Sequence, residues 1–109
     1  MKRIILLASI VSFAAALAVS AGEPKDNWGT SCARCHGADG KGQTNMGRRL
    51  GAKDYTDAGV QSALTDDAAF KAIKEGFKDK DGKTVMRPAD KLSDEEVKGL
   101  VAYLRTFKK

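Results

Sequence analysis

Two cysteines and the only histidine of this 109-residue chain stand together in the sequence, as Cys32-Ala33-Arg34-Cys35-His36. On one turn of a helix, thiols three positions apart lie on the same side, and each can form a thioether with one vinyl group of a haem. The imidazole that follows directly then lies under the iron, where it acts as the proximal ligand. The C-x-x-C-H pattern therefore predicts covalent attachment of one c-type haem through Cys32, Cys35 and His36.

Two other chemistries use similar residues. A C-x-x-C pair in a thioredoxin-like protein opens a helix after a strand, whereas this sequence shows no strand pattern. A closed structural zinc site needs four ligands, and His36 with the two cysteines supplies only three. Both alternatives are therefore weaker than haem attachment.

The single histidine also limits the distal ligand of the iron. Without a second imidazole, the sixth position is held by methionine, by a weaker ligand such as lysine, or stays open. Met46 lies in a glycine-rich stretch, whereas Met86 lies between two expected helices, two residues before Pro88, which stiffens its segment. We expect Met86 to be the distal ligand. Met46 and a site without methionine remain alternatives, and either methionine could instead fill a gap in the core.

The elements that must hold these residues are mostly helical. Ser93 and Glu96 form a capping box, which predicts the start of the last helix. Phe70, Ile73 and Phe77 recur at the spacing of a helix face. Helices are therefore expected over residues 24–33, 57–64, 65–78 and 93–107.

Glycines separate these helices. Five of them fall within residues 37–53, which are expected to be mostly loop. An Asp81-Gly82 turn signal lies in the segment between the last two expected helices. The predicted fold class is all-α, with three to four helices and long loops wrapped around one covalent haem.

The first 21 residues differ from the rest of the chain. Lys2 and Arg3 precede an uncharged, mostly apolar run, which ends in the small residues Val19-Ser20-Ala21. This pattern predicts a cleaved secretory signal peptide over residues 1–21, followed by a single domain over residues 22–109 and a periplasmic location. An uncleaved membrane anchor is the alternative, because the uncharged run is near the minimum length that spans a bilayer.

The chain resembles the class I monohaem cytochrome c family over residues 24–107. The resemblance rests on the C-x-x-C-H pattern, on Met86 late in the chain, and on the run Leu100-Val101-Ala102-Tyr103-Leu104 in the last expected helix. It implies the cytochrome c fold, a bond between the iron and the sulfur of Met86, and a role in electron transfer.

The same resemblance implies a contact between two helices. In the family, an aromatic residue four positions before the first cysteine packs against an aromatic residue of the terminal helix, and Trp28 and Tyr103 occupy those positions. The family usually has proline directly after the ligand methionine, whereas here Arg87 stands between Met86 and Pro88.

The coordination predicts the function. An iron with both axial positions filled has no site for a substrate, so the expected protein is an electron carrier and not an enzyme. A haem enzyme such as a peroxidase would need an open position and usually a distal acid-base residue, and no distal histidine exists. A ligand-binding sensor, or an electron-transfer domain of a larger complex, is the other alternative.

The charge of the chain bears on its partners. The formal net charge is +5, and it falls to +3 without residues 1–21. So modest a charge, without a recognition motif, predicts no nucleic-acid binding.

A monomer with redox proteins as electron donor and acceptor is expected. Basic residues are expected near the haem: Lys71, Lys74 and Lys78 on one helical face, followed by Lys80, Lys83 and Arg87. These residues either dock an acidic partner or only keep the protein soluble, because Asp79 and Asp81 interleave with them.

Overall fold

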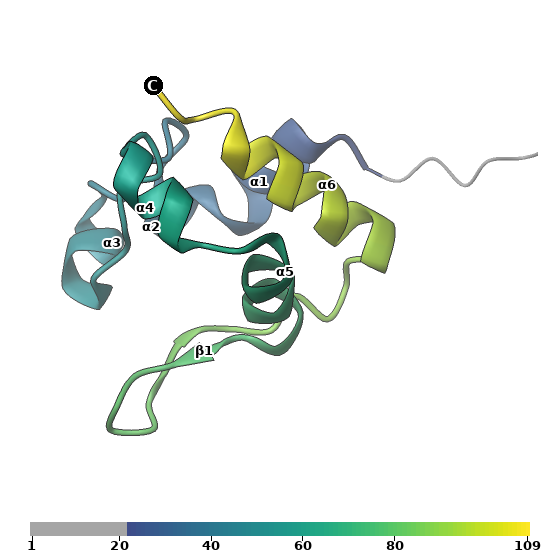
Figure 1. Ribbon diagram of the computed structural model, residues 1–109. Coiled ribbons are helices and arrows are strands. Elements are labelled where there is room, and N and C mark those ends of the chain that lie inside the picture. The colour runs from purple at the N-terminus through teal and green to yellow at the C-terminus, as the bar shows by residue number, and fades with distance from the viewer. Residues whose placement is uncertain (1–21) are drawn as a thin grey trace, which may run out of the picture.

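The structure is a computed structural model, and it describes residues 22–109. The expected signal peptide, residues 1–21, lies outside the described residues. The described part is mostly helical, as the sequence predicted, with six helices and one short hairpin (Figure 1). In chain order the elements are α1 Pro24–Ser31, α2 Ala33–His36, α3 Asn45–Leu50, α4 Ala58–Ala63, α5 Asp66–Glu75, β1 Phe77–Lys78, β2 Thr84–Met86 and α6 Asp94–Arg105.

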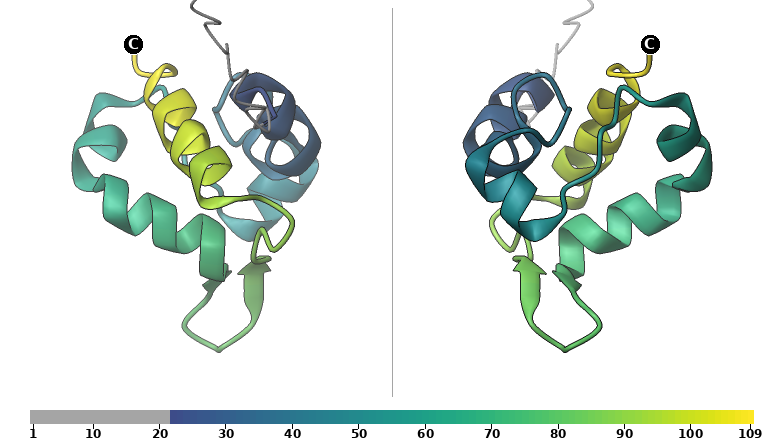
Figure 2. Two further views of the ribbon diagram at one scale, coloured as in Figure 1. Left: turned by 90° about the vertical axis from the view of Figure 1, so that its right-hand side faces the viewer. Right: turned by 90° about the vertical axis from the view of Figure 1, so that its left-hand side faces the viewer.

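The core lies where α6 packs against α1 and α5 (Figure 2). The ring of Trp28 lies 5.8 Å from the ring of Tyr103 and 5.0 Å from that of Phe107, between centroids. The expected contact between Trp28 and Tyr103 is therefore present. The buried apolar residues of this core are Trp28, Cys32, Ala69, Ile73, Val97, Leu100, Val101 and Leu104.

Helix α6 begins where the sequence predicted. The Ser93 side chain accepts a hydrogen bond from the backbone N–H of Glu96 at 3.1 Å, and the backbone N–H of Ser93 donates to the Glu96 carboxylate at 3.2 Å. This reciprocal pair satisfies two of the N–H groups that a helix start leaves free. Val97 and Leu100 of α6 are fully buried, so the cap fixes the helix that supplies the centre of the core.

Helix α5 ends three residues earlier than expected. Gly76 follows it with a φ of +81°, a conformation that residues with a Cβ rarely adopt, and this turns the chain out of the helix. Phe77 then lies in β1 with 56% of its surface exposed, and Lys78 follows it. The expectation of one helix over residues 65–78 was therefore wrong at its end, and Lys78 does not share a helical face with Lys71 and Lys74.

The loop expected over residues 37–53 contains the short helix α3. The Thr44 hydroxyl caps it by accepting a hydrogen bond from the backbone N–H of Gly47 at 2.8 Å, and the same hydroxyl donates to the carbonyl of Cys35 at 2.8 Å. One threonine thus starts α3 and ties it to α2. The helix expected over residues 57–64 is present as α4, where the Asp57 side chain accepts from the backbone N–H of Val60.

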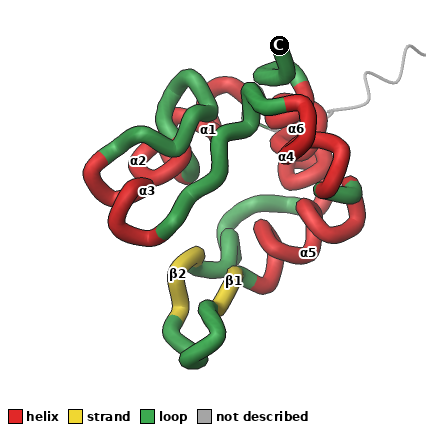
Figure 3. The backbone as a smooth tube through the Cα atoms, turned by 60° about the vertical axis from the view of Figure 1, so that its left-hand side comes forward, coloured by secondary structure: helices red, strands yellow, loops and turns green. Residues whose placement is uncertain are grey.

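The sequence showed no strand pattern, yet β1 and β2 form a small antiparallel hairpin, with Phe77 opposite Met86. Its turn is held by the Asp79 carboxylate, which accepts hydrogen bonds from the backbone N–H groups of Asp81 and Lys83, both at 2.9 Å. The hairpin projects from the helical body (Figure 3). Within residues 22–109, no helix is long and apolar enough to span a bilayer.

Candidate haem site

The C-x-x-C-H pattern begins at Cys32, the single residue between α1 and α2, and its other residues form α2. The backbone N–H of Cys32 donates to the carbonyl of Trp28, and the backbone N–H of His36 donates to the carbonyl of Cys32, each at 2.9 Å. Neither cysteine forms a disulfide within residues 22–109, so both are available for attachment of a haem. Burial, and to a smaller extent the neighbouring Cys35, raises the pKa of the Cys32 thiol to about 11, so this thiol is protonated at neutral pH.

One cavity brings together three of the four predicted site residues. Cys32, His36 and Met86 all line it, although they come from different places in the fold. Cys32 directly precedes α2, His36 ends α2 and Met86 ends β2. Cys35 is half-buried on α2 and does not line the cavity, and neither does Met46 of α3. The remaining lining residues are mostly apolar or aromatic: Trp28, Tyr55, Leu64, Ala69, Ala72, Ile73 and Leu104.

The imidazole of His36 lies near two aromatic rings. Its centroid lies 5.7 Å from that of Trp28 and 5.4 Å from that of Tyr55. Burial lowers the pKa of His36, which favours the neutral ring that binds metals. Its Nδ1 atom is buried and has no hydrogen-bond partner in the described part of the chain. A buried polar atom without a partner is costly, and such atoms are often found at sites where the structure binds another group.

Met86 is held against the end of α5. A Cβ built on Gly76 would lie 2.6 Å from the carbonyl oxygen of Met86 and 2.9 Å from Pro88, so the two segments touch there with no room for a side chain. Further on, the backbone N–H of Ala89 donates to the carbonyl of Ile73 at 2.9 Å. Together with the hairpin pairing, these contacts fix the backbone on both sides of Met86, which was expected in a loop.

Sequence reasoning missed two residues that shape this cavity. Tyr55 lines it, and the buried Gln61 of α4 donates hydrogen bonds to the carbonyls of Tyr55 and Leu104, at 2.7 and 2.9 Å. Arg105 in turn donates to the Gln61 side-chain oxygen at 2.8 Å. A lone aromatic residue in a polar segment was the only signal for Tyr55, and nothing in the sequence marked Gln61 as buried.

These residues fit a covalently bound haem. Two free thiols stand at the required spacing, the adjacent imidazole has an unpartnered buried nitrogen, and the cavity beside them has an apolar lining. Such a lining suits the porphyrin, and the thiols and imidazole suit its vinyl groups and its iron.

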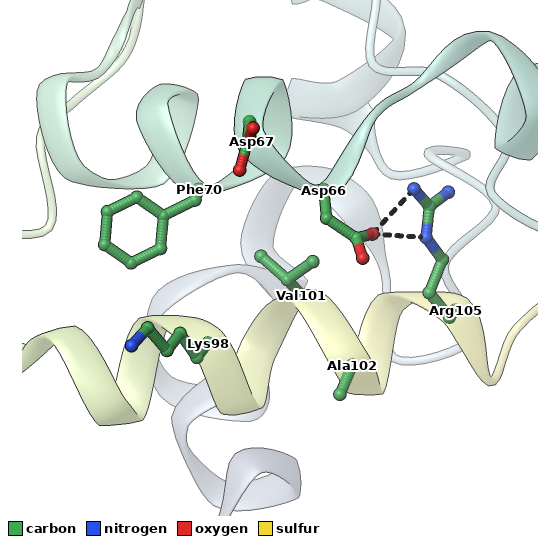
Figure 4. A pocket seen from close by; sticks show the side chains of 7 residues that line it. All are labelled: Asp66, Asp67, Phe70, Lys98, Val101, Ala102 and Arg105. Carbon is green, nitrogen blue, oxygen red and sulfur yellow. Dashed lines mark hydrogen bonds and ion pairs between the residues drawn. The ribbon is translucent and has the colours of Figure 1, made fainter.

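A second, wider depression of about 380 Å³ lies between α5 and α6 (Figure 4). Phe70 and Val101 form its apolar floor, and an ion pair between Asp66 and Arg105 closes one end at 2.9 Å. Its lining contains no cysteine, histidine or methionine, so it offers neither a thiol for haem attachment nor an imidazole or thioether for the iron.

Comparisons with known proteins identify the family of this chain and its cofactor. The family model described as cytochrome c matches residues 25–108. The structure is similar to that of the c-type cytochrome KustC0563, with a TM-score of 0.71 and 36% identity over 80% of this chain and 99% of the other. A tyrosine-to-phenylalanine mutant of the same protein gives a TM-score of 0.68 and 36% identity, over 79% of this chain and 99% of the other.

A third similar chain belongs to a larger assembly, the reducing HAO-like protein complex of Kuenenia stuttgartiensis. Its TM-score is 0.61 at 25% identity, over 80% of this chain and 42% of the other. A search of curated proteins found no match. Given the match over residues 25–108, this chain belongs to the cytochrome c family, and its cofactor is covalently bound haem c with its iron.

Proposed function

We propose that this protein carries single electrons, with the haem bound to Cys32 and Cys35, His36 as proximal ligand and Met86 as distal ligand. The proposal rests on the one cavity that Cys32, His36 and Met86 all line. Met46, the other methionine considered, does not line it. Among the ligand sets that the sequence left open, the pair of His36 and Met86 therefore fits best.

The bound haem supplies a reversible change in the oxidation state of its iron. In this proposal His36 and Met86 would both bind the iron, so the iron would offer no position to a substrate. The thioether of Met86 favours the ferrous state and raises the reduction potential relative to ligation by two histidines. Apolar residues such as Leu64 and Leu104 exclude water from the cavity, which limits solvent rearrangement when the charge changes.

The proposal treats the protein as an electron carrier and not as an enzyme. A peroxidase-like enzyme or a gas sensor would need an open or easily displaced sixth ligand. Adding carbon monoxide to the ferrous protein tests this difference. We expect no change in the visible spectrum, because Met86 occupies the position; rapid carbon monoxide binding would contradict the proposed ligation and favour a sensor or an enzyme.

Processing and location form part of the proposal. Residues 1–21 are removed as a signal peptide, and residues 22–109 work in the periplasm as a monomer. The mature mass should equal residues 22–109 plus one haem, and acidified organic solvent should not extract that haem. Retention of residues 1–21 in the purified protein would instead indicate a membrane-tethered form.

A second candidate function is that of an electron-transfer subunit in a larger complex. It is favoured by the similarity to a longer chain of the reducing HAO-like complex, of which this chain covers 42%. Size-exclusion chromatography of the native protein from cell extract distinguishes the two candidates. A small monomer supports a free carrier, whereas elution at high mass supports a subunit.

The electron donor and acceptor of a free carrier are other redox proteins. The positive net charge of residues 22–109 favours partners with an acidic docking surface, because opposite charge accelerates encounter.

A further inference from the structure

Gln61 is the only polar or charged residue that is buried within residues 22–109, with 5% of its surface exposed. Its amide nitrogen donates to the backbone carbonyl of Tyr55 at 2.7 Å and to that of Leu104 at 2.9 Å. Tyr55 and Leu104 both line the cavity proposed for the haem. The buried amide nitrogen of α4 therefore holds two separate parts of the cavity wall.

Arg105 holds the other end of the same amide. Its Nη1 atom donates to the side-chain oxygen and to the backbone carbonyl of Gln61, both at 2.8 Å. Its Nη2 atom donates to the carbonyl of Leu64, which is a third residue of the cavity lining. Because a guanidinium only donates hydrogen bonds, the amide oxygen has to face Arg105, and the amide nitrogen faces the two carbonyls. Arg105 thus fixes the orientation of the Gln61 amide.

An ion pair fixes Arg105 in turn. Its Nε and Nη2 atoms donate to one carboxylate oxygen of Asp66, at 3.0 and 2.9 Å (Figure 4). The Asp66 side chain is 74% exposed, whereas the side chain of Arg105 is 32% exposed. The network therefore runs from solvent, at the end of the depression between α5 and α6, through Arg105 and Gln61 to the cavity wall.

Two of the three carbonyls depend on this pair alone. Those of Tyr55 and Leu64 accept no other hydrogen bond within residues 22–109, whereas that of Leu104 also accepts from the backbone N–H of Phe107 at 3.3 Å. A carbonyl that loses its donor inside a protein has to find another donor, and water is the one at hand. Without the pair, water would be drawn to the wall of the cavity.

We propose that Gln61 and Arg105 form a positioning pair, which holds Tyr55, Leu64 and Leu104 around the haem and keeps water out of that side of the cavity. The inference rests on the proposed placement of the haem in this cavity. It adds to that proposal two residues that help to set the reduction potential without touching the iron.

The pair acts beside the proposed proximal ligand, because the ring of Tyr55 lies 5.4 Å from the imidazole of His36 between centroids. The oxidised iron carries one more positive charge than the reduced iron, and water stabilises that charge. A dry cavity wall therefore favours the reduced state and raises the reduction potential. If the pair only fastened α4 to α6, its loss would lower the stability of the fold and leave the potential unchanged.

The first test measures the reduction potential of the holoprotein with Gln61→Leu. Leucine fills the space without a donor for the carbonyls or an acceptor for Arg105, and the net charge stays the same. The potential should shift to a lower value. The N–H of Tyr55, which donates to the carbonyl of Gly40 at 2.8 Å, should exchange with solvent about tenfold faster, because this residue has lost one of its two backbone hydrogen bonds.

Arg105→Lys is the second variant, and it decides the question alone if Gln61→Leu yields no holoprotein. It retains the positive charge, so a change in potential cannot come from the loss of that charge. The lysine ammonium cannot contact Gln61, Leu64 and Asp66 together as the planar guanidinium does. We expect a lower potential than in the wild type, and a smaller shift than in Gln61→Leu, because Gln61 can still donate to Tyr55.

Ser93→Ala is the matched control. It removes the cap at the opposite end of α6 from Arg105, and Ser93 does not line the cavity. Urea unfolding should show a lower stability. The reduction potential, and the exchange of the Tyr55 amide relative to that of Leu100 in the core, should both stay as in the wild type.

Three outcomes would overturn the inference. An unchanged potential in both Gln61→Leu and Arg105→Lys would show that the pair only fastens helices. An equal shift in Ser93→Ala would show that the potential follows overall stability. Loss of the far-red band in Gln61→Leu would assign the shift to the loss of Met86 from the iron. Carbon monoxide binding by the ferrous wild-type protein would instead contradict the proposed function, and the comparison of potentials would still test the pair because it requires only the bound haem.

Discussion

The indole N–H of Trp28 donates a buried hydrogen bond to the carbonyl oxygen of Gly37 at 2.8 Å. This bond joins the residue four positions before the first cysteine to the residue directly after the histidine. It therefore links the chain just before Cys32 to the chain just after His36 and holds the segment between them in place. The same indole ring packs against His36. The aromatic residue that the family resemblance associated with helix packing thus also fixes the haem attachment segment.

Replacing Trp28 with phenylalanine should destabilise the holoprotein by about 1 to 3 kcal/mol. The carbonyl of Gly37 loses the shorter of its two hydrogen bonds and keeps only the one from the backbone N–H of Gly40 at 3.2 Å, and the smaller ring leaves a gap in the core. Urea unfolding measures the change. Tyr103→Phe is the matched control, since it also removes one polar atom from the aromatic cluster, and the Tyr103 hydroxyl makes no hydrogen bond within residues 22–109. Equal losses in the two variants would show that the bond to Gly37 is unimportant.

Met86→Ala should lower the reduction potential and allow carbon monoxide to bind the ferrous protein, because the proposed distal thioether is removed. The weak far-red band of methionine-bound ferric haem, expected from the family resemblance, should also disappear. Met46→Ala is the control, as it removes the same side chain from outside the cavity, and it should change none of these properties. If only the Met46 variant lost the band, Met46 would be the ligand.

Gly47→Ala should destabilise the protein by about 3 kcal/mol, because its Cβ would overlap the carbonyl oxygens of Cys35 and Gly42, at 2.1 and 2.5 Å. These are backbone atoms and cannot rotate away, so α3 would have to move off α2. Gly29→Ala makes the same change in α1, where a Cβ meets nothing within 4 Å. It should stabilise the protein by about 0.5 to 1 kcal/mol. Thermal unfolding of both variants checks the contrast.

Acid should weaken the attachment of α6 to Gly22 and Asn27. Hydrogen bonds from the backbone of Ser93, from Asn27 and from the backbone of Gly22 lower the pKa of Glu96. A carboxyl group whose pKa is lower in the folded state stabilises the fold fully above its ordinary pKa of 4.5 and loses this effect as pH falls through the lower value. Glu96→Gln should therefore unfold with a weaker dependence on pH below about 4.5.

The control for that experiment is Glu95→Gln, which removes the same charge from the same first turn, where Glu95 contacts only Lys98 at 3.5 Å. Its acid unfolding should follow that of the wild type. A Glu96 variant that also followed the wild type would mean that its hydrogen bonds do not depend on the ionised carboxylate.

The sequence predicted those features that depend on local patterns. The C-x-x-C-H segment, the capping box at Ser93 and the apolar positions of α6 each lie within a few residues, and all fold as expected. The contact of Trp28 with Tyr103 followed from the family resemblance and is also present.

Features that depend on contacts between distant segments could not be predicted in this way. The end of α5 depends on Gly76 meeting the backbone of Met86, which pairs with Phe77 across the hairpin. Helix α3 depends on Thr44 reaching the carbonyl of Cys35. The burial of Gln61 depends on its bonds to Tyr55 and Leu104. Local glycine content and residue spacing indicate none of these contacts, so the helix limits and the hairpin were missed.

A potentiometric titration of the purified mature protein, followed by visible absorption, tests the proposed function most directly. We predict a single reversible transition that fits one electron, with a slope of about 59 mV per tenfold change in the ratio of oxidised to reduced protein. The far-red band should be present in the oxidised form and absent after reduction. An irreversible transition, or an oxidised spectrum typical of haem with an open sixth position, would contradict an electron carrier with His36 and Met86 as its ligands.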